Sequence, residues 1–445
     1  MRVSIIGTGY VGLVTGVCLA DKGHFVVGVD VDAAKVERLH RGEAPIHEAG
    51  LSELLARHAG TRFVATTDLA RAVQDTDLTL LAVGTPFDGK SIDLSYVVGA
   101  TRQVGIALRD KAEPHVVAVK SSVVPGTTDG VVRTELEEAS RRRVGDGLGL
   151  GVNPEFLTEG QAVGDFMNPD RIVIGGTESR TLDALAELYA GFPGVPVIRT
   201  NNKSAEMIKY ASNALLATMI SFSNQFADLC TALGGVDVRD VMAGLHASAY
   251  LTVRESSGRS VAAPIVTFLE AGCGFGGSCL PKDVSALVAH GAANGVDMEL
   301  LQSVLDVNRQ RPDRVLEGIL REVEDLRGVK VAVLGLAFKP DTDDVRESPA
   351  FPIIHRLLAE GARVTAFDPV AVASARDVLG DAAVPFAGSL EEAVDDAEVV
   401  VIVTRWREFE RLPSLLRERG RSPFVFDGRR MLDANQVERY GGIGR

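Results

Sequence analysis

The chain has 445 residues, of which 46% are hydrophobic and 5% aromatic, and its formal net charge at pH 7 is −13. This length predicts two or three domains, and the negative charge argues against nucleic acid or an anionic membrane as the main partner. The four cysteines form no C-x-x-C pair, no apolar run is long enough to span a membrane, and the N-terminus resembles no signal peptide, so we expect a cytoplasmic protein.

The N-terminal segment predicts a strand, a glycine turn and a helix. Residues 2–6 form a short apolar run, and Gly7-Thr-Gly9-Tyr-Val-Gly12 follows before an apolar helical stretch. In this context the glycines predict a dinucleotide-binding turn. Gly7 permits the tight turn, Gly9 lets the backbone approach the pyrophosphate, and Gly12 brings the helix against the strand.

The next predicted strand, residues 24–29, ends at Asp30. An acid at this place binds the adenosine ribose hydroxyls and repels a 2′-phosphate, which favours NAD over NADP. Lys35, on the following segment, is the one feature that tempers this preference. The remaining expected cofactor contacts are Tyr10 and Val11 at the helix N-terminus, and Thr85 and Ser122 in polar turns that follow later strands. Taken alone, those two turns read as ordinary loops.

Apolar runs predict further strands at residues 78–83, 116–120, 149–152 and 171–175, which gives an N-terminal domain of residues 1–198. Residues 203–233 form the strongest helical segment, because they contain neither Pro nor Gly and stop at a Gly-Gly pair. This helix is apolar around much of its circumference, so we expect it to be buried against other elements or against a second subunit. It belongs to a central helical domain of residues 199–312.

The last part of the chain repeats the opening pattern. Lys330-Val-Ala-Val-Leu-Gly335 mirrors residues 2–7, and the strand that ends at Asp368 mirrors the one that ends at Asp30. The second copy lacks the second and third glycines of the turn, so we expect only the first copy to bind a dinucleotide. The predicted fold class is therefore α/β, with two Rossmann-like domains, the second at residues 313–445, joined by a long central helix.

The segment from Gly274 to Asp283 reads Gly-Phe-Gly-Gly-Ser-Cys-Leu-Pro-Lys-Asp and places Cys279 beside Lys282. Small residues let a substrate carbon approach the thiol, and a nearby lysine with the turn amides lowers a thiol's pKa towards the nucleophilic thiolate. Beside a dehydrogenase turn, this pattern predicts oxidation of an alcohol to an aldehyde that is then captured covalently. The alternative is a buried, inert cysteine in a glycine-rich turn.

These motifs together resemble the UDP-glucose/GDP-mannose dehydrogenase family of nucleotide-sugar dehydrogenases over nearly the whole chain. The resemblance rests on six motifs in order: the glycine turn, Asn153-Pro-Glu-Phe-Leu-Thr-Glu-Gly, Asn168-Pro-Asp-Arg-Ile-Val-Ile-Gly, Lys209-x-x-x-Asn213, the Cys279 segment, and Phe338-Lys-Pro-Asp-Thr-Asp-Asp-Val-Arg-Glu-Ser-Pro. It implies a four-electron oxidation of a sugar C6 alcohol to a carboxylate with two NAD⁺, through a thiohemiacetal and a thioester on Cys279. UDP-glucose is the default donor.

The resemblance also implies the site residues. The catalytic set is Cys279, Lys209, Asn213, Asp283, Glu159 and Ser122. Lys209 and Asn213 share one helix face and suit stabilisation of an oxyanion, but acid and base cannot be assigned among Glu159, Lys209 and Asp283. Without the family context, Lys209 would read as a surface partner of Glu206.

Substrate contacts are expected from Glu155, Phe156, Leu157, Glu159, Lys209, Asn213, Phe268, Gly276, Lys339 and Arg429, and a cofactor contact from Arg346. Lys339 and Arg429 are expected at the nucleotide half, where cationic donors suit a diphosphate. The family also implies a homodimer through the central helix. We predict no metal site.

The chain departs from the family pattern between Val241 and Phe268, where residues 245–264 form a longer stretch than usual. Arg254 or Arg259 could replace a family arginine of this region. GDP-mannose and a UDP-N-acetylhexosamine therefore remain open as donors. Two further readings are a two-electron hydroxy-acid dehydrogenase, which needs neither Cys279 nor a second Rossmann-like domain, and a catalytically silent sensor of NAD or nucleotide sugar.

Overall fold

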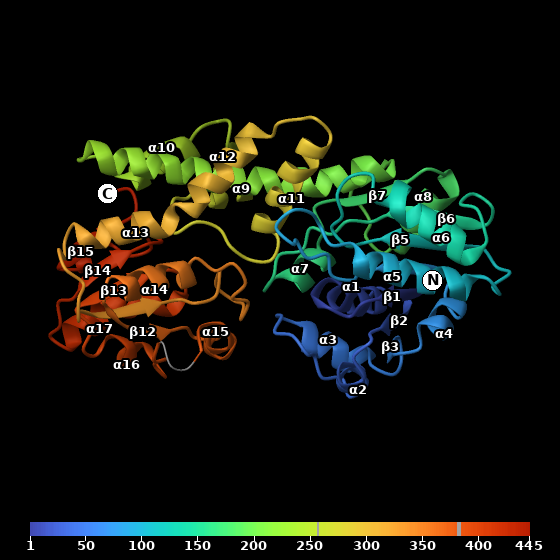
Figure 1. The fold of residues 1–445 in the computed structure, drawn as a ribbon, viewed down its shortest axis with the longest axis horizontal. Coiled ribbons are helices and arrows are strands. Elements are labelled where there is room, and N and C mark those ends of the chain that lie inside the picture. Colours follow the sequence, from blue (N-terminus) through green and yellow to red (C-terminus); the bar gives the residue numbers. More distant parts are fainter. Residues whose placement is uncertain (256–257, 381–383) are drawn as a thin grey trace. The chain divides into compact units, whose positions relative to one another are not determined.

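The computed structural model describes residues 1–255, 258–380 and 384–445 (Figure 1). The chain forms two compact units, Met1–Ser212 and Asn213–Arg445. The division between them lies inside helix α9 (Asn202–Leu233), which occupies almost the same residues as the long helix predicted from the sequence. Across the described residues, no helix is both long and apolar enough to cross a membrane.

The N-terminal unit is built on an eight-stranded sheet with the order β3-β2-β1-β4-β5-β6-β7-β8. Every neighbouring pair in it is parallel except β6 and β7, which are antiparallel. The strands are β1 (Arg2–Ile6), β2 (Phe25–Val29), β3 (Phe63–Thr66), β4 (Leu78–Leu81), β5 (His115–Val119), β6 (Leu148–Val152), β7 (Ile172–Gly176) and β8 (Val197–Thr200).

Helices cover both faces of this sheet, as in other parallel sheets that are buried on two sides. Its helices besides α9 are α1 (Tyr10–Asp21), α2 (Ala33–His40), α3 (Leu51–His58), α4 (Leu69–Gln74), α5 (Ser95–Leu108), the π-helical turn η1 (Thr128–Val132), α6 (Arg133–Ser140), α7 (Ala162–Met167) and α8 (Ser179–Leu188). Within β1, Val3 and Ile5 belong to the core shared with α1, α3, α7 and α8, whereas Ile6 belongs to the core shared with α4, α5 and α6. The unit is therefore a doubly wound, Rossmann-like domain.

The C-terminal unit holds the second Rossmann-like domain, a five-stranded parallel sheet with the order β12-β11-β13-β14-β15. These strands are β11 (Lys330–Leu334), β12 (Arg363–Phe367), β13 (Val399–Ile402), β14 (Phe424–Asp427) and β15 (Arg439–Gly442). A separate antiparallel hairpin pairs β9 (Thr252–Arg254) with β10 (Ser260–Ala262). The predicted fold class, two Rossmann-like domains and a long central helix, is confirmed.

One continuous core joins the sheet of this unit to the second half of α9 and to its other helices except the two within residues 280–309. Eight α-helices follow α9 in the described residues. These are α10 (Val238–His246), α11 (Leu280–Ala293), α12 (Glu299–Arg309), α13 (Arg311–Leu320), α14 (Ala350–Ala359), α15 (Val372–Leu379), α16 (Leu390–Val394) and α17 (Leu412–Glu418), with short 3₁₀ turns at η2 (Pro264–Phe268), η3 (Arg407–Arg411) and η4 (Ala434–Gln436).

The acid that follows β12 is bound by the turn after β11. Asp368, which follows β12, accepts hydrogen bonds from the amides of Leu336 (2.7 Å) and Ala337 (3.1 Å) and from the indole of Trp406 (2.9 Å). The carboxylate is therefore bound by its own loop and by a neighbouring aromatic side chain. The prediction that only the first copy binds a dinucleotide continues to rest on the missing second and third glycines of this turn.

Candidate functional site

The glycine turn after β1 has the close contacts that its sequence predicts. Gly7 has φ +97°, and a Cβ there would lie 2.8 Å from the carbonyl oxygen of Ala82. A Cβ on Gly12 would lie 1.9 Å from the carbonyl oxygen of Gly7, so the helix can approach the strand only with glycine at this position. Around Gly9, no atom of the described residues lies within 4 Å of the corresponding point, apart from the glycine itself and its two chain neighbours. This space, beside the first-turn amides of Tyr10 and Val11, fits a dinucleotide pyrophosphate.

Asp30 is 9% exposed at the end of β2. Its carboxylate accepts hydrogen bonds from the Thr8 amide (3.1 Å), the Thr8 hydroxyl (2.7 Å) and the Lys35 ammonium (2.9 Å). Burial alone would raise the pKa of Asp30, but the hydrogen bonds from Lys35 and Thr8 outweigh it and lower that pKa. The acid is thus held ionised where a ribose is expected, and Lys35 lies directly against it.

The polar turns after β4 and β5 are joined to each other. The Thr85 hydroxyl donates to the backbone oxygen of Ser122 (2.9 Å), and the hydroxyl of Ser121 donates to that of Val83 (2.6 Å). Because β4 and β5 are neighbours in the sheet, both predicted contacts lie at the carboxyl edge, where α/β sheets bind ligands.

Lys209 and Glu155 form a buried ion pair in the N-terminal unit. The Lys209 Nζ lies 2.8 Å from Glu155 Oε1, and the two side chains are 5% and 7% exposed. Burial alone would raise the pKa of Glu155, but the charge and hydrogen bond of Lys209 outweigh it and lower that pKa. The Phe156 ring lies 5.6 Å from Lys209 Nζ and 4.1 Å from the Arg171 guanidinium carbon.

The alternative partner of Lys209, Glu206, is engaged elsewhere. Its carboxylate accepts hydrogen bonds from the amides of Gly126 (2.6 Å) and Thr128 (2.9 Å), in the turn that precedes α6. Reading Lys209 as a surface partner of Glu206 is therefore wrong, because Lys209 is buried and pairs with Glu155 from another segment.

A second buried lysine, which the sequence analysis did not select, lies beside this pair. Lys120 is 2% exposed, and its Nζ donates to the side-chain oxygen (3.1 Å) and the backbone oxygen (3.3 Å) of Asn153. Burial, with a smaller contribution from the charge of Lys209, lowers the pKa of Lys120 to about 8 although Glu155 opposes the shift. The one feature of the sequence that could have identified Lys120 is its position directly after the apolar strand β5.

Glu159 is half-buried in the turn between β6 and α7, directly before Gly160, which has φ +82°. Leu157, in the same turn, donates its amide to Glu155 Oε2 (2.6 Å). A buried carboxylate that sequence reasoning missed, Glu48, binds the turn on its other side and accepts from the amides of Gly160 (2.7 Å) and Ala162 (2.9 Å).

In the C-terminal unit, Cys279 is the N-cap of α11 and is exposed, whereas Cys18, Cys230 and Cys273 are buried. Its Sγ lies 3.5 Å from the Ser278 hydroxyl. Burial raises the pKa of Cys18 to about 12 and that of Cys273 to about 11, so these thiols stay protonated at neutral pH. Of the four cysteines, Cys279 has the accessibility that a nucleophile needs.

The glycines before Cys279 are held by close packing. A Cβ on Gly276 would lie 2.2 Å from the carbonyl oxygen of Glu347, and one on Gly277 would lie 2.7 Å from the Phe338 ring. The amide of Gly277 donates to the Arg346 carbonyl (2.9 Å). The cysteine turn is therefore fixed against the 338–349 motif, which the sequence shows only as a separate family motif.

Two of the predicted catalytic residues, Asn213 and Asp283, are hydrogen-bonded to each other in the C-terminal unit. Asn213 Nδ2 donates to Asp283 Oδ2 (2.6 Å), and Lys282 Nζ lies 2.5 Å from Asp283 Oδ1. Asp283 is 1% exposed and Asn213 is 8% exposed. Both oxygens of this carboxylate are thus bound, one turn of α11 after Cys279.

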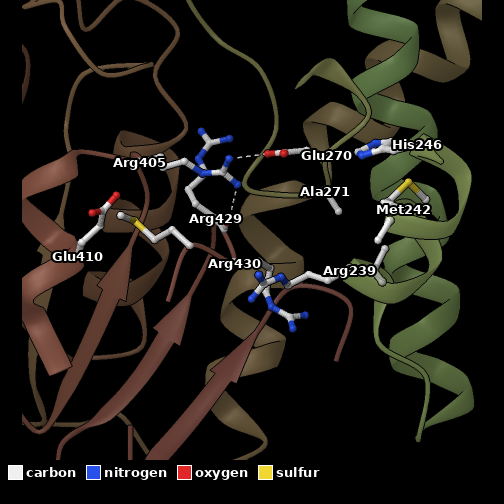
Figure 2. Close-up of a pocket in the computed structure, with 12 residues that line it drawn as sticks. Arg239, Met242, His246, Glu270, Ala271, Arg405, Glu410, Arg429 and Arg430 are labelled. Carbon is white, nitrogen blue, oxygen red and sulfur yellow. Dashed lines mark hydrogen bonds and ion pairs between the residues drawn. The ribbon is translucent and has the colours of Figure 1, made fainter. Parts of the chain in front are cut away.

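A cavity of about 410 Å³ opens beside the C-terminal sheet (Figure 2). Its lining side chains come from α10, the segment before the cysteine turn and the loops after β13 and β14: Val238, Arg239, Met242, Ala243, His246, Glu270, Ala271, Arg405, Glu410, Arg429, Arg430 and Met431. Arg405 pairs with Glu270 (2.6 Å), and Arg429 Nη1 donates to the Gly274 carbonyl (3.3 Å). Four arginines against two glutamates leave the cavity cationic, and Arg429 joins it to the cysteine turn.

The remaining predicted residues also lie in the C-terminal unit. Phe268, at the end of η2, and Lys339 are half-buried, and Arg346 pairs with Asp344 (2.5 Å). Within residues 245–264 the described part contains the β9–β10 hairpin, on which Arg254 and Arg259 are exposed. Ser256 and Ser257 of that segment lie outside the described residues.

Because burial lowers the pKa of Lys120, the free-energy cost of burying this side chain on folding depends on pH. The unfolded chain protonates this lysine below roughly pH 10.4 and the folded chain only below about 8. Its contribution to the free energy of unfolding should therefore rise by up to about 3 kcal/mol between these limits. Lys120→Met should be most favourable relative to wild type at pH 7.5 and lose about 2 kcal/mol of that advantage by pH 9.5. Urea unfolding followed by far-UV circular dichroism tests this, and a difference that does not change with pH would contradict it.

Comparison with known proteins covers both units. The three models of the UDP-glucose/GDP-mannose dehydrogenase family match in order: the NAD binding domain at residues 1–193, the central domain at 203–310 and the UDP binding domain at 332–434. The UDP-glucose 6-dehydrogenase of Haloferax volcanii is 45% identical and covers 97% of each chain. The GDP-mannose 6-dehydrogenase of Pseudomonas putida is 37% identical over 93% of each chain.

A solved UDP-glucose dehydrogenase from Pyrobaculum islandicum superposes with a TM-score of 0.90 at 39% identity, over 100% of this chain and 97% of that one. The NAD binding model lies over the glycine turn and Asp30, so the cofactor is NAD. The chain belongs to the UDP-glucose/GDP-mannose dehydrogenase family.

Proposed function

We propose that this chain is a nucleotide-sugar 6-dehydrogenase that oxidises the C6 alcohol of its donor to a carboxylate through covalent intermediates on Cys279, with UDP-glucose as the default donor. The observation that carries the proposal is one exposed thiol at the start of α11, followed one turn later by the buried Asp283. A two-electron hydroxy-acid dehydrogenase has no use for this arrangement.

The cofactor would supply the hydride acceptor for two oxidations, alcohol to aldehyde and thiohemiacetal to thioester, and each oxidation would use a separate NAD⁺. The open space at Gly9, the first-turn amides of α1 and the ionised Asp30 would hold it. Asp30 disfavours a 2′-phosphate, although Lys35 lies beside it.

Between the two oxidations Cys279 bonds to the aldehyde carbon, and the carbonyl oxygen takes up a proton as the thiol gives one up. The partial positive charge at the N-terminal end of α11 favours the sulfur as an anion. Lys209, paired with Glu155, and Asn213 are the donors for the oxyanion that forms. Water then attacks the thioester, the C–S bond breaks, and the sulfur leaves as thiolate.

Two carboxylates suit the proton transfers. Asp283, whose two oxygens are bound by Asn213 and Lys282, is the first candidate to take a proton from the thiol or from the hydrolytic water. Glu159, half-buried in its turn, is the second candidate for activating that water, with Ser122 as its orienting partner.

The cationic cavity at Arg429 is the proposed site of the nucleotide diphosphate, with Lys339 as a further donor. The relative in Pseudomonas putida is a GDP-mannose 6-dehydrogenase, so GDP-mannose stays an alternative donor, as does a UDP-N-acetylhexosamine. All four cysteines are free, which suits the reducing cytoplasm.

We also propose a homodimer through α9. An apolar stripe with coiled-coil-like spacing is exposed on this helix and consists of Leu215, Phe222, Phe226, Leu229 and Leu233. A second copy of the same stripe would cover it in a symmetric interface.

Replacing Cys279 by alanine removes the nucleophile and should lower kcat with UDP-glucose by at least about 10³-fold. Cys273→Ala is the matched control, because Cys273 is a free cysteine of the same segment that is buried and protonated. It should keep turnover within a few-fold of wild type. Initial rates of NADH formation measure both variants, and equal loss in both would contradict the assignment. If wild type is inactive on UDP-glucose, the same comparison on GDP-mannose and UDP-N-acetylhexosamines decides the donor.

Leu229→Glu places a charge in the middle of the apolar stripe and should convert the dimer to monomers in sedimentation velocity. The control is Leu300→Glu, since Leu300 is at least as exposed as Leu229 but lies on α12 outside the stripe. A wild-type monomer, or a dimer that survives Leu229→Glu, would contradict the dimer proposal.

A further inference from the structure

Glu48 lies in the loop between α2 and α3, far in sequence from every motif of the site, yet it is only 6% exposed. A buried carboxylate is costly unless its oxygens are bound. One oxygen of Glu48 accepts from the Tyr10 hydroxyl and from the Gly160 amide (2.7 Å), and the other accepts from the Ala162 amide (2.9 Å). The loop therefore places an ionisable group at the meeting point of two functional segments.

The first of these segments is the dinucleotide turn. Tyr10 is the first residue of α1 and follows Gly9 directly, so its backbone amide belongs to the proposed phosphate site while its hydroxyl reaches Glu48. Burial, reinforced by the hydrogen bond to Glu48, raises the pKa of Tyr10 well above its usual value. The hydroxyl thus stays protonated and donates to the carboxylate.

The second segment is the turn that carries Glu159. Its next residue, Gly160, donates its amide both to Glu48 and to the Tyr10 hydroxyl (3.0 Å). Earlier in the turn, the amide of Thr158 donates to Asp165 (2.8 Å). Amides on both sides of Glu159 are thus bound by carboxylates, and Glu48 is the one that also binds the dinucleotide turn.

We propose that Glu48 is a positioning residue that couples occupancy of the dinucleotide turn to the placement of Glu159. The inference rests on the proposed function, in which Glu159 serves the hydrolytic step. When NAD⁺ fixes the start of α1, Tyr10 and Glu48 hold the Gly160 and Ala162 amides more firmly. Loss of the carboxylate uncouples the two segments and leaves the phosphate-binding backbone intact.

Hydrogen–deuterium exchange of the native full-length protein tests this without any sugar. In wild type, NAD⁺ should slow exchange in peptides that cover residues 156–166. Glu48→Gln, which keeps the size of the side chain but loses its charge, should bind NAD⁺ within about threefold of the wild-type Kd and show no such slowing. Glu43→Gln is the control, because Glu43 lies in the same loop but its carboxylate pairs with the surface side chain of Arg41.

Kinetics supply the second readout. Glu48→Gln should lower kcat by about tenfold or more with little change in KM for NAD⁺. Tyr10→Phe should also abolish the NAD⁺-induced slowing at residues 156–166, and the double variant should be no worse than Glu48→Gln alone. NAD⁺-induced slowing that persists in Glu48→Gln, or that is missing in a wild type that binds NAD⁺, would overturn the inference. A wild type that does not bind NAD⁺ would instead overturn the proposed function and the inference with it.

Discussion

The buried ion pair between Lys209 and Glu155 sets the chemistry of the N-terminal unit. It brings the end of β6 to the start of α9 and holds a cation at a place from which water is largely excluded. With Lys120 also buried nearby, two cations face one carboxylate, so the cluster carries excess positive charge below about pH 8. Such a cluster favours negative charge that develops on a bound substrate, which is what oxyanion stabilisation requires.

The C-terminal unit exposes the Cys279 thiol to solvent and substrate. Its cysteine turn is fixed by glycines that pack against Glu347 and Phe338. Cys279, whose sulfur is exposed, is the N-cap of α11. The same turn continues into the cationic cavity through the hydrogen bond of Arg429 to Gly274. A nucleotide bound in that cavity and a sugar that reaches Cys279 would therefore use one rigid segment.

The sequence predicted those parts of the fold and site that are encoded locally. The glycine turn, the acid after β2, the long helix and the cysteine segment each have their own short pattern. β3 and β8 were missed because both are edge strands without a continuous buried apolar run, and β8 is largely exposed. Lys120, Glu48 and the true partner of Lys209 were missed because their contacts join residues distant in the chain. A buried lysine or glutamate looks the same in a sequence as a solvated one.

The number of NADH molecules formed for each nucleotide sugar consumed, measured at completion with wild-type protein, tests the central claim most directly. Covalent capture on Cys279 followed by a second oxidation predicts two NADH and one uronate for each sugar. One NADH for each sugar, with an aldehyde or ketone as the final product, would contradict the account.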